Sequence, residues 1–258
     1  MHMIGKVEKY LLDKIQEGGT IHITLLDPEK VTPQSASKTA REVETCNTAA
    51  IMVGGSTLTS TSHLDDVVKA IKKAVKIPVI LFPNNITGIC RHADAIWFMS
   101  LLNSSDPYFI AGAQVWGAPL IKKFDLEVIP LGYIIVGESS AVSVVGRACP
   151  IPYNKPELAA AHALAAQYFG MRFVYLEAGS GAKQPPTNDM IKTVKEFVNV
   201  PLIVGGGIRT SHQVREAVDA GADIIVTGTV VEESGRVRDL IGELVDCAKL
   251  GGARDDSV

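Results

Sequence analysis

Two glycine-rich turns near the end of the chain have the composition of a phosphate-binding site. Gly205-Gly206-Gly207 follows a short apolar run, and Thr227-Gly228-Thr229 follows the next one. Glycine lets backbone N–H groups approach an anion closely, and a helix that starts after such a turn adds a positive dipole. One such turn often only reverses the chain, but two after neighbouring strands favour phosphate binding. The candidate residues are Gly206, Gly207, Gly228 and Thr229.

A tyrosine and a glutamate two residues apart could orient and deprotonate a hydroxyl group. Tyr175 and Glu177 flank Leu176 in an apolar run that leads into the turn Ala178-Gly179-Ser180-Gly181. Strand alternation puts the phenol and the carboxylate on one face, so both point inward if Leu176 faces the surrounding helices. An inward carboxylate at a strand end can act as a general base. Its alternative role is an internal ion pair with a lysine or arginine.

An aspartate after the first apolar run could hold a magnesium ion. Asp27-Pro28 follows this run, and Gly54-Gly55-Ser56 follows the second. Mg²⁺ prefers oxygen ligands and is often held by one or two carboxylates, waters and substrate phosphates. We therefore consider Asp27 and Ser56 as metal ligands. Asp-Pro and Ser are equally typical of helix caps, so this alternative stays open.

Aromatic side chains cluster around the fourth repeat of the chain. They are Trp97, Phe98, Tyr108, Phe109 and Trp116. Such residues are often ordinary core, but a site for a long apolar ligand needs the same kind of lining. The leading candidates for an apolar channel are Trp97, Tyr108 and Phe109.

The elements that position these residues alternate along nearly the whole chain. Eight apolar runs predict strands: Ile21–Leu26, Ala50–Val53, Val79–Phe82, Ala95–Met99, Val128–Val136, Phe173–Leu176, Leu202–Val204 and Ile224–Val226. Runs this uniformly apolar are typical of parallel strands covered on both faces by helices. The stretches between them predict helices at Ala36–Cys46, His63–Val75, Pro107–Lys122, Pro156–Phe169, Thr187–Val198, Ser211–Ala220 and Arg236–Leu250. This repetition favours an α/β (βα)8 TIM barrel over an open sheet.

The third unit departs from the repeat. Phe82 and Ala95 are separated only by residues 83–94, which include Pro83 and Gly88. This is too short for a crossover helix with two loops, so we expect a loop or a single turn in its place. We identify no linker, and residues 1–258 are predicted to form a single TIM-barrel domain. Its active site should lie at the carboxyl ends of the strands.

Composition excludes several classes of protein. The chain has 258 residues with 25 Lys plus Arg and 28 Asp plus Glu, and its net charge of −3 does not favour nucleic-acid binding. Its apolar runs are shorter than the roughly 20 residues of a membrane span, and Met1–Tyr10 has no signal-peptide pattern. The four cysteines and six histidines form no CxxC or HExxH pattern, so zinc is not expected. We expect a cytoplasmic protein with reduced cysteines.

Together these motifs resemble the geranylgeranylglyceryl phosphate synthases, within the wider prenylglyceryl phosphate synthase family of archaeal ether-lipid biosynthesis. The resemblance runs in order over nearly the full chain, through His22–Lys30, Gly54–Thr57, Tyr175–Ala182, Val204–Thr210 and Thr227–Thr229. Tyr175–Ala182 is its most specific part, whereas the glycine turns occur in many phosphate-binding barrels. A loop in place of the third helix also fits the family.

The resemblance implies an Mg²⁺-dependent prenyltransferase. It would move a geranylgeranyl group from geranylgeranyl diphosphate to the 3-hydroxyl of sn-glycerol 1-phosphate. Asp27 and Ser56 would ligate Mg²⁺, and Glu177, with Tyr175 beside it, would accept the hydroxyl proton unless the diphosphate takes it. Glycerol phosphate would contact one continuous stretch and the two glycine turns: Tyr175, Leu176, Glu177, Ala178, Gly179, Ser180, Gly181, Gly206, Gly207, Gly228 and Thr229.

One position departs from a pattern of the family. Some members have Lys-Leu-Asp-Pro, with a lysine two residues before the aspartate, where this chain has Leu25. This indicates the other main branch of the family and leaves the cationic partner of the diphosphate open. We also expect a homo-oligomer, either a dimer or a hexamer, and peripheral membrane association for the lipid product.

Two other functions would use part of the same motifs. A sugar-phosphate isomerase or aldolase would keep the phosphate turns, but would more often have a catalytic lysine or an aspartate pair and no apolar channel. A non-catalytic barrel that binds a phosphorylated lipid precursor would need the turns but neither Glu177 nor metal ligands. Formation of an ether product, with and without Mg²⁺, discriminates among the three.

Overall fold

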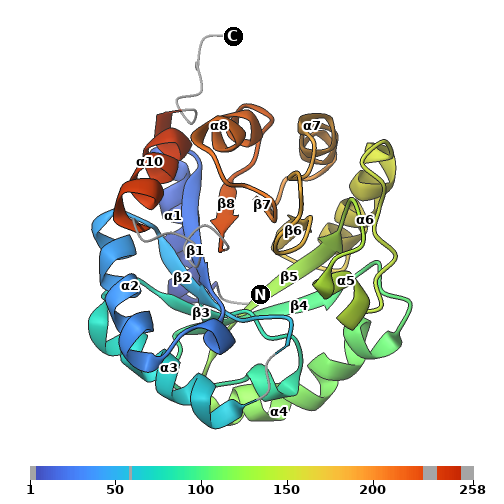
Figure 1. The fold of residues 1–258 in the computed structure, drawn as a ribbon. Helices are drawn as coiled ribbons and strands as arrows, with labels where there is room; N and C mark the ends of the chain where they lie inside the picture. Colours follow the sequence, from blue (N-terminus) through green and yellow to red (C-terminus); the bar gives the residue numbers. More distant parts are fainter. Residues whose placement is uncertain (1–3, 58–59, 229–236, 251–258) are drawn as a thin grey trace.

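Eight parallel strands close into a barrel in the computed structural model, which describes residues 4–57, 60–228 and 237–250. Figure 1 views this barrel with its helices around it. Each strand pairs with the next, and β8 pairs with β1, where Ile23 lies opposite Val226. The predicted TIM barrel is confirmed. The strands are β1 (Ile21–Leu26), β2 (Ala50–Val53), β3 (Val79–Leu81), β4 (Ala95–Leu101), β5 (Glu127–Ile135), β6 (Phe173–Glu177), β7 (Leu202–Gly205) and β8 (Ile224–Thr227).

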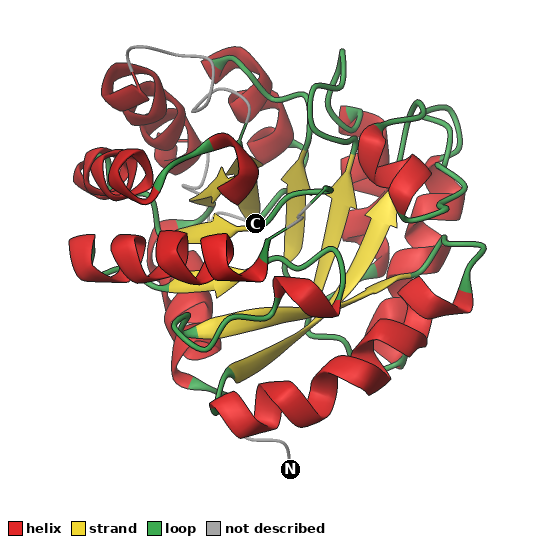
Figure 2. Cartoon of the chain, turned by 60° about the horizontal axis from the view of Figure 1, so that its bottom comes forward, coloured by secondary structure: helices red, strands yellow, loops and turns green. Residues whose placement is uncertain are grey.

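Helices cover the outside of the strands, as Figure 2 shows from another side. Several begin at a hydroxyl side chain that accepts a backbone hydrogen bond: Thr32 caps one helix and Thr187 another, because each satisfies a free N–H of the first turn. The larger helices after the first strand lie close to their predicted ranges. They are α2 (Pro33–Thr45), α3 (Thr61–Ala74), α4 (Ala113–Phe124), α6 (Pro156–Tyr168), α7 (Asn188–Phe197), α8 (Ser211–Asp219) and α10 (Val237–Leu250).

The third connection contains only one helical turn. This turn, η2 (Ile86–Gly88), starts at Asn85, whose side-chain oxygen accepts hydrogen bonds from the Thr87 N–H and hydroxyl. The expected replacement of the third helix by a loop or single turn is confirmed. The helix predicted at Pro107–Lys122 begins as the π-helical turn η3 (Tyr108–Gly112) and continues as α4. Two other short elements, η1 (Pro28–Lys30) and α5 (Ala141–Val145), were not among the predicted helices.

A helix that we did not predict, α1 (Lys6–Gly18), lies against the amino-terminal ends of the strands. Its Val7 and Leu11 are buried among side chains of the barrel interior. The carboxylate of Glu127, the first residue of β5, accepts hydrogen bonds from the Val7 and Glu8 N–H groups at 2.8 and 2.7 Å. Glu8 is fully buried and forms an ion pair with Arg172, just before β6. Helix α1 is therefore tied by hydrogen bonds and an ion pair to the end of the barrel opposite the predicted active site.

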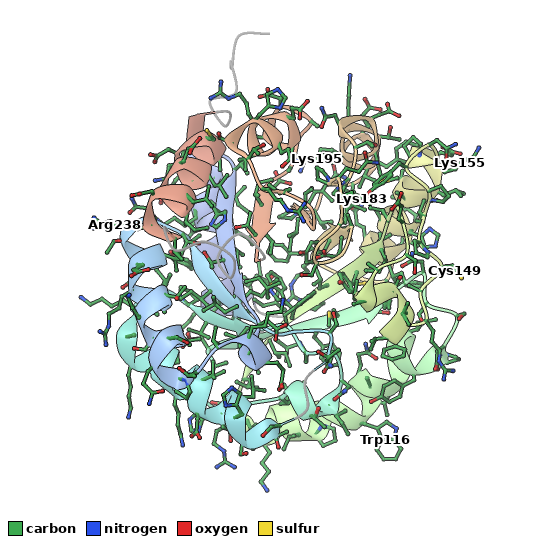
Figure 3. All side chains as sticks on the ribbon, viewed as in Figure 1. Trp116, Cys149, Lys155, Lys183, Lys195 and Arg238 are labelled. Carbon is green, nitrogen blue, oxygen red and sulfur yellow. The ribbon has the colours of Figure 1, made fainter. Side chains whose placement is uncertain are left out.

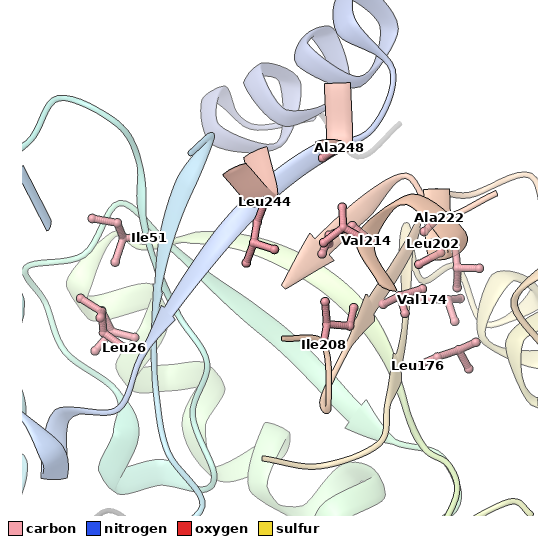
Figure 4. Close-up of a cluster of buried hydrophobic side chains, with 14 of the residues drawn as sticks. Leu26, Ile51, Val174, Leu176, Leu202, Ile208, Val214, Ala222, Leu244 and Ala248 are labelled. Carbon is pink, nitrogen blue, oxygen red and sulfur yellow. The ribbon is translucent and has the colours of Figure 1, made fainter. Parts of the chain in front are cut away.

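Strand alternation divides the core into two clusters. Side chains such as Met52, Trp97 and Tyr175 fill the barrel interior. The alternate residues, including Leu26 and Leu176, pack between the strands and the helices, and Figure 4 shows part of this outer cluster. Leu176 therefore faces outward, and its neighbours Tyr175 and Glu177 point inward.

Candidate active site

The carboxylate of Glu177 lies at the carboxyl end of β6, where the strands open into the mouth of the barrel. Glu177 is 5% exposed, and its Oε1 accepts a hydrogen bond from the Gly179 N–H at 2.8 Å. Burial raises the pKa of Glu177 above its ordinary value of 4.5, while the nearby Tyr175 phenol and the hydrogen bond from the Gly179 N–H oppose the shift. A buried carboxyl group with a raised pKa is a suitable general base near neutral pH.

Three aromatic rings surround this carboxylate on the inner side of the mouth. The ring centroids of Phe82, Tyr133 and Tyr175 lie 5.3 to 5.7 Å from one another. Burial, followed by the charge of Glu177, raises the pKa of Tyr133 and of Tyr175 well above 10.0. Both phenols therefore stay neutral, and they can donate a hydrogen bond or present a ring face to a substrate.

The glycine turn after β7 forms a small polar hollow together with the end of β8. Gly206 and Gly207 have φ angles of 79° and 75°, which only glycine adopts without strain. A Cβ at Gly206 would lie 2.6 Å from the Gly179 nitrogen, so the turns after β6 and β7 are in direct contact. The hollow also contains Gly228, whereas Thr229 lies outside the described residues.

Arg209 contributes a positive charge to the same hollow. Its Nη1 donates a hydrogen bond to the Ala182 carbonyl at 2.7 Å, which connects the β7 turn to the β6 turn. Immediately after it, Thr210 and Gln213 form the capping box of α8, so the helix N-terminus lies beside the turn. Glycine backbone, a helix dipole and a guanidinium together suit a phosphate group.

Asp27 and Ser56 line the mouth of the barrel on its β1–β2 side. Asp27 Oδ1 accepts a hydrogen bond from the Glu29 N–H at 3.0 Å, so this residue also caps η1. A Cβ at Gly55 would lie 2.6 Å from Asp27 Cγ, which shows that the carboxylate rests against the backbone just before Ser56. Among the described residues no cluster of three His, Cys, Asp or Glu side chains could hold a metal.

Asn84, from the loop after β3, completes this corner of the mouth. Its Nδ2 donates a hydrogen bond to the Ser56 carbonyl at 3.0 Å. Its Oδ1 is buried and has no hydrogen-bond partner among the described residues. An aspartate carboxylate, a hydroxyl and an unpaired amide oxygen form an all-oxygen donor set, which fits Mg²⁺ shared with a substrate phosphate.

An apolar groove extends outward from the mouth. The loop that contains η2 forms one wall and α4 forms the other. Of the channel candidates, Phe109 and Trp97 border the groove, whereas Tyr108 is not among its lining residues and packs edge-on against Phe109. Trp97 is fully buried, and its indole contacts Phe173 and donates to Met52 Sδ at 3.1 Å, so it belongs equally to the barrel core. Side chains on the two walls include Ile86, Ile89, Ala113, Gly117 and Ile121.

The mouth joins the phosphate hollow to the apolar groove. Glu177 and Gly228 line both the hollow and the mouth, and Tyr133 and Asn84 line both the mouth and the groove. An anion site, a buried carboxylate, an oxygen-rich corner and an apolar groove are thus continuous. This arrangement can hold a small phosphorylated alcohol against the head of a long apolar diphosphate.

Comparison with known proteins decides the family. The sequence profile of the PcrB family matches residues 13–247. This chain belongs to the PcrB family. It is 55% identical over 249 residues to a geranylgeranylglyceryl phosphate synthase from Thermofilum pendens, covering 96% of this chain and 97% of that protein. It is 54% identical over 243 residues to the synthase from Pyrococcus furiosus, covering 94% and 96% of the two chains.

Solved structures of PcrB-family proteins have the same fold. The (S)-3-O-geranylgeranylglyceryl phosphate synthase from Thermoplasma acidophilum, in complex with its substrate sn-glycerol-1-phosphate, superposes with a TM-score of 0.92. It is 40% identical, and the match covers 96% of this chain and all of that one. A wild-type GGGPS from Thermoplasma volcanium gives a TM-score of 0.90 at 42% identity, with 94% and 97% coverage. A thiamine phosphate pyrophosphorylase from Pyrococcus furiosus, at 14% identity and a TM-score of 0.59, shares only the barrel fold.

Four residues of the site were not predicted from the sequence: Phe82, Asn84, Tyr133 and Arg209. Phe82 and Tyr133 belong to apolar runs, where inward and outward positions look alike until the strand register is known. Arg209 stands two residues after the glycine turn, and a cation at that place is a signal that we could have used. Asn84 stands in a polar loop, where only its contact with Ser56 distinguishes it from its neighbours.

Proposed function

We propose that this protein transfers the geranylgeranyl group of geranylgeranyl diphosphate to the 3-hydroxyl of sn-glycerol 1-phosphate. The observation that carries this function is the continuous path from the phosphate hollow, past Glu177, into the apolar groove. A long prenyl chain needs an apolar groove, and a glycerol phosphate needs an anion site beside a base. The 54–55% identity to geranylgeranylglyceryl phosphate synthases supports the same reaction.

In the transfer a C–O bond forms between the glycerol 3-oxygen and the first carbon of the prenyl chain. The bond from that carbon to the diphosphate breaks, and its electron pair leaves with the diphosphate. Glu177 accepts the hydroxyl proton, and the Gly179 N–H keeps its carboxylate in place. The Tyr175 phenol orients the hydroxyl. Burial excludes water that would otherwise compete for an allylic carbon with cationic character.

Glycerol phosphate would bind in the phosphate hollow. Its phosphate contacts the Gly206, Gly207 and Gly228 backbone and the Arg209 guanidinium, and Thr229 is assigned to the same site from the sequence alone. The glycerol lies along the stretch Tyr175–Gly181. An anchored phosphate on a rigid barrel fixes the distance and direction of the attacking oxygen, which is a large part of catalysis by positioning.

Mg²⁺ is the proposed cofactor, held by Asp27 and Ser56, and when bound it neutralises the leaving diphosphate. The prenyl chain lies in the groove beside Phe109, with Trp97 at its wall. Tyr108 supports Phe109 from behind through their edge-to-face contact. These assignments explain how one barrel separates an anionic head group from a hydrocarbon tail.

We further propose a cytoplasmic homo-oligomer, a dimer or a hexamer, that associates peripherally with membranes when it releases its lipid product. Large apolar side chains are exposed on two outer surfaces: Trp116 on α4, and Tyr168 and Phe169 at the end of α6, each more than 70% exposed. Figure 3 shows Trp116 pointing away from the barrel. Within the described residues, no helix is long and apolar enough to cross a bilayer. Light scattering after size-exclusion chromatography measures the subunit number.

The function is tested by incubating the protein with radiolabelled geranylgeranyl diphosphate and sn-glycerol 1-phosphate. We expect a butanol-extractable phosphorylated ether that forms with Mg²⁺ and not with excess EDTA. The enantiomer sn-glycerol 3-phosphate is the matched control, because it has the same charge and size. Binding of both substrates without an ether product would instead favour a non-catalytic sensor, and isomerisation of a sugar phosphate would favour the other enzyme class.

A further inference from the structure

We infer that Asn84 supplies a third protein oxygen to the cation at the diphosphate, beside Asp27 and Ser56. This inference rests on the proposed function, because that function places a metal–diphosphate group in the mouth of the barrel. Asn84 comes from the loop that replaces the third helix, its amide contacts the Ser56 carbonyl, and it lines the mouth together with Asp27 and Ser56. Three observations carry the assignment.

The first observation is the fixed orientation of the Asn84 amide. The group that faces Ser56 meets a carbonyl oxygen at 3.0 Å, and a carbonyl only accepts hydrogen bonds. The amino end of the amide must therefore point at Ser56, since the reverse orientation would bring two acceptors together. The position of Oδ1 follows from this contact.

The second observation is that this oxygen has no hydrogen-bond donor. Oδ1 is buried and unpaired among the described residues. An unsatisfied buried acceptor costs about 1–3 kcal/mol, so the complete site should supply a partner. The diphosphate cannot be that partner, because its oxygens are acceptors too. A divalent cation, or a water that the cation holds, satisfies Oδ1.

The third observation is the charge of the mouth. Among the described residues that line it, Asp27 and Glu177 are acidic and none is a lysine or arginine. The position two residues before Asp27 is Leu25, where some members of the family have a lysine. The described residues of the mouth thus offer the diphosphate no cation, and in this proposal the metal supplies the positive charge. A neutral amide ligand strengthens metal binding without adding a third negative charge that would repel the diphosphate.

The test is a titration with Mn²⁺, followed by electron paramagnetic resonance, in the presence of inorganic diphosphate. Asn84→Leu and Asn84→Asp both remove the hydrogen bond to Ser56, but only the aspartate keeps an oxygen toward the cation. We expect Asn84→Leu to weaken Mn²⁺ binding by about 10-fold or more, in the range found for groups that support a metal site. Asn84→Asp should lose clearly less Mn²⁺ affinity than Asn84→Leu, because it keeps an oxygen ligand although its added charge repels the diphosphate.

Asn85→Ala is the matched control. Asn85 is the next residue in the same loop, but its side-chain oxygen already accepts hydrogen bonds from Thr87. Its removal disturbs η2 without touching the corner at Ser56, so Mn²⁺ binding should not change. Asp27→Ala serves as the positive control for loss of the site.

Two results would overturn the assignment. Native Mn²⁺ affinity in Asn84→Leu would show that the oxygen has no role, and equal losses in the leucine and aspartate variants would show that only the contact with Ser56 matters. The proposed function is tested separately, by the ether assay on the native protein. A native protein that forms ether while Asn84→Leu keeps its metal refutes the inference alone; one that forms no ether refutes the function.

Discussion

The Glu177 carboxylate is held by the backbone N–H of Gly179, with 2.8 Å between Oε1 and the nitrogen. The two residues belong to one turn, and Gly179 has a φ of 100°, a conformation that favours glycine. The turn that is proposed to carry the glycerol therefore also fixes the direction of the base. In the proposed reaction, one short segment of backbone would therefore position both the substrate and the base.

Glu177→Gln should reduce turnover by about 10²–10⁴-fold, because the amide keeps the size of the side chain but cannot accept the hydroxyl proton. Binding of glycerol phosphate, measured by calorimetry, should change far less than kcat. Such a split is expected when an interaction matters mainly in the transition state. Nearly native turnover would transfer the role of proton acceptor to the diphosphate.

The raised pKa of Glu177 predicts opposite effects of pH on activity and on stability. The base must be ionised, so kcat should fall as pH drops through a pKa above 4.5. Between 4.5 and that pKa the native state binds more protons than the unfolded state, so the free energy of unfolding should decrease as pH rises across this window. Rate profiles and denaturant titrations measure the two effects. Both should disappear in Glu177→Gln, and a stability slope that persists there must come from another group.

Gly206→Ala should weaken glycerol phosphate binding and turnover by at least about 10-fold, equivalent to ~1.4 kcal/mol. The added methyl group would overlap the Glu177 carboxylate and the backbone nitrogen of Gly179, besides straining a φ of 79°. Gly170→Ala is the control, because Gly170 has a φ of 84° and no atom within 4 Å of the added Cβ. Both variants should lose about 1–2 kcal/mol of stability to backbone strain, but only Gly206→Ala should lose function.

Asp27→Asn and Asp27→Ala separate the two roles of this residue. Asparagine can still accept the hydrogen bond from Glu29 that caps η1, whereas alanine cannot and should lose about 0.5–2 kcal/mol of stability. Both variants lack the negative charge, so both should lose activation by Mg²⁺. Thermal unfolding and initial rates over a range of Mg²⁺ concentrations measure these effects. Normal Mg²⁺ activation of the asparagine variant would leave Asp27 only its role as a cap.

Phe109→Ala should shift the preferred prenyl length, because the side chain lines the apolar groove. Tyr108→Ala should not, since Tyr108 only packs against Phe109. Competition between farnesyl and geranylgeranyl diphosphates measures the preference. Trp97→Ala should instead lower stability by about 3–5 kcal/mol, as for other fully buried aromatic residues. A length shift in Tyr108→Ala equal to that in Phe109→Ala would show that the ring pair acts as one wall.

The barrel could be predicted because each of its strands is an apolar run, and the phosphate hollow could be predicted because its turns are marked by glycine. The direction of Tyr175 and Glu177 followed from alternation with Leu176. The helix α1 has the spacing of an amphipathic helix at Val7, Leu11 and Ile15, a signal that we did not use.

Other features depend on contacts between distant parts of the chain. Asn84 and Ser56 meet across two neighbouring strand ends, and no local pattern records this pairing. Trp97 and Phe109 are both apolar residues of the fourth unit. Only the register of β4 and the path of the chain beyond it show that Trp97 belongs to the barrel interior as well as to the groove wall, whereas Phe109 lies beyond the strand at the groove.

The short third connection affects how the product is released from the enzyme. Because η2 stands where a full helix would cover the barrel wall, the groove beside α4 can hold a hydrocarbon tail while the hollow beyond Glu177 holds a phosphate. The ether product of the proposed reaction carries both groups on one molecule, so it would occupy both places at once. Each buried methylene adds about 0.8 kcal/mol to its retention. Departure of the finished lipid, not bond formation, should therefore limit the cycle, and an acceptor bilayer at the groove should shorten the residence time.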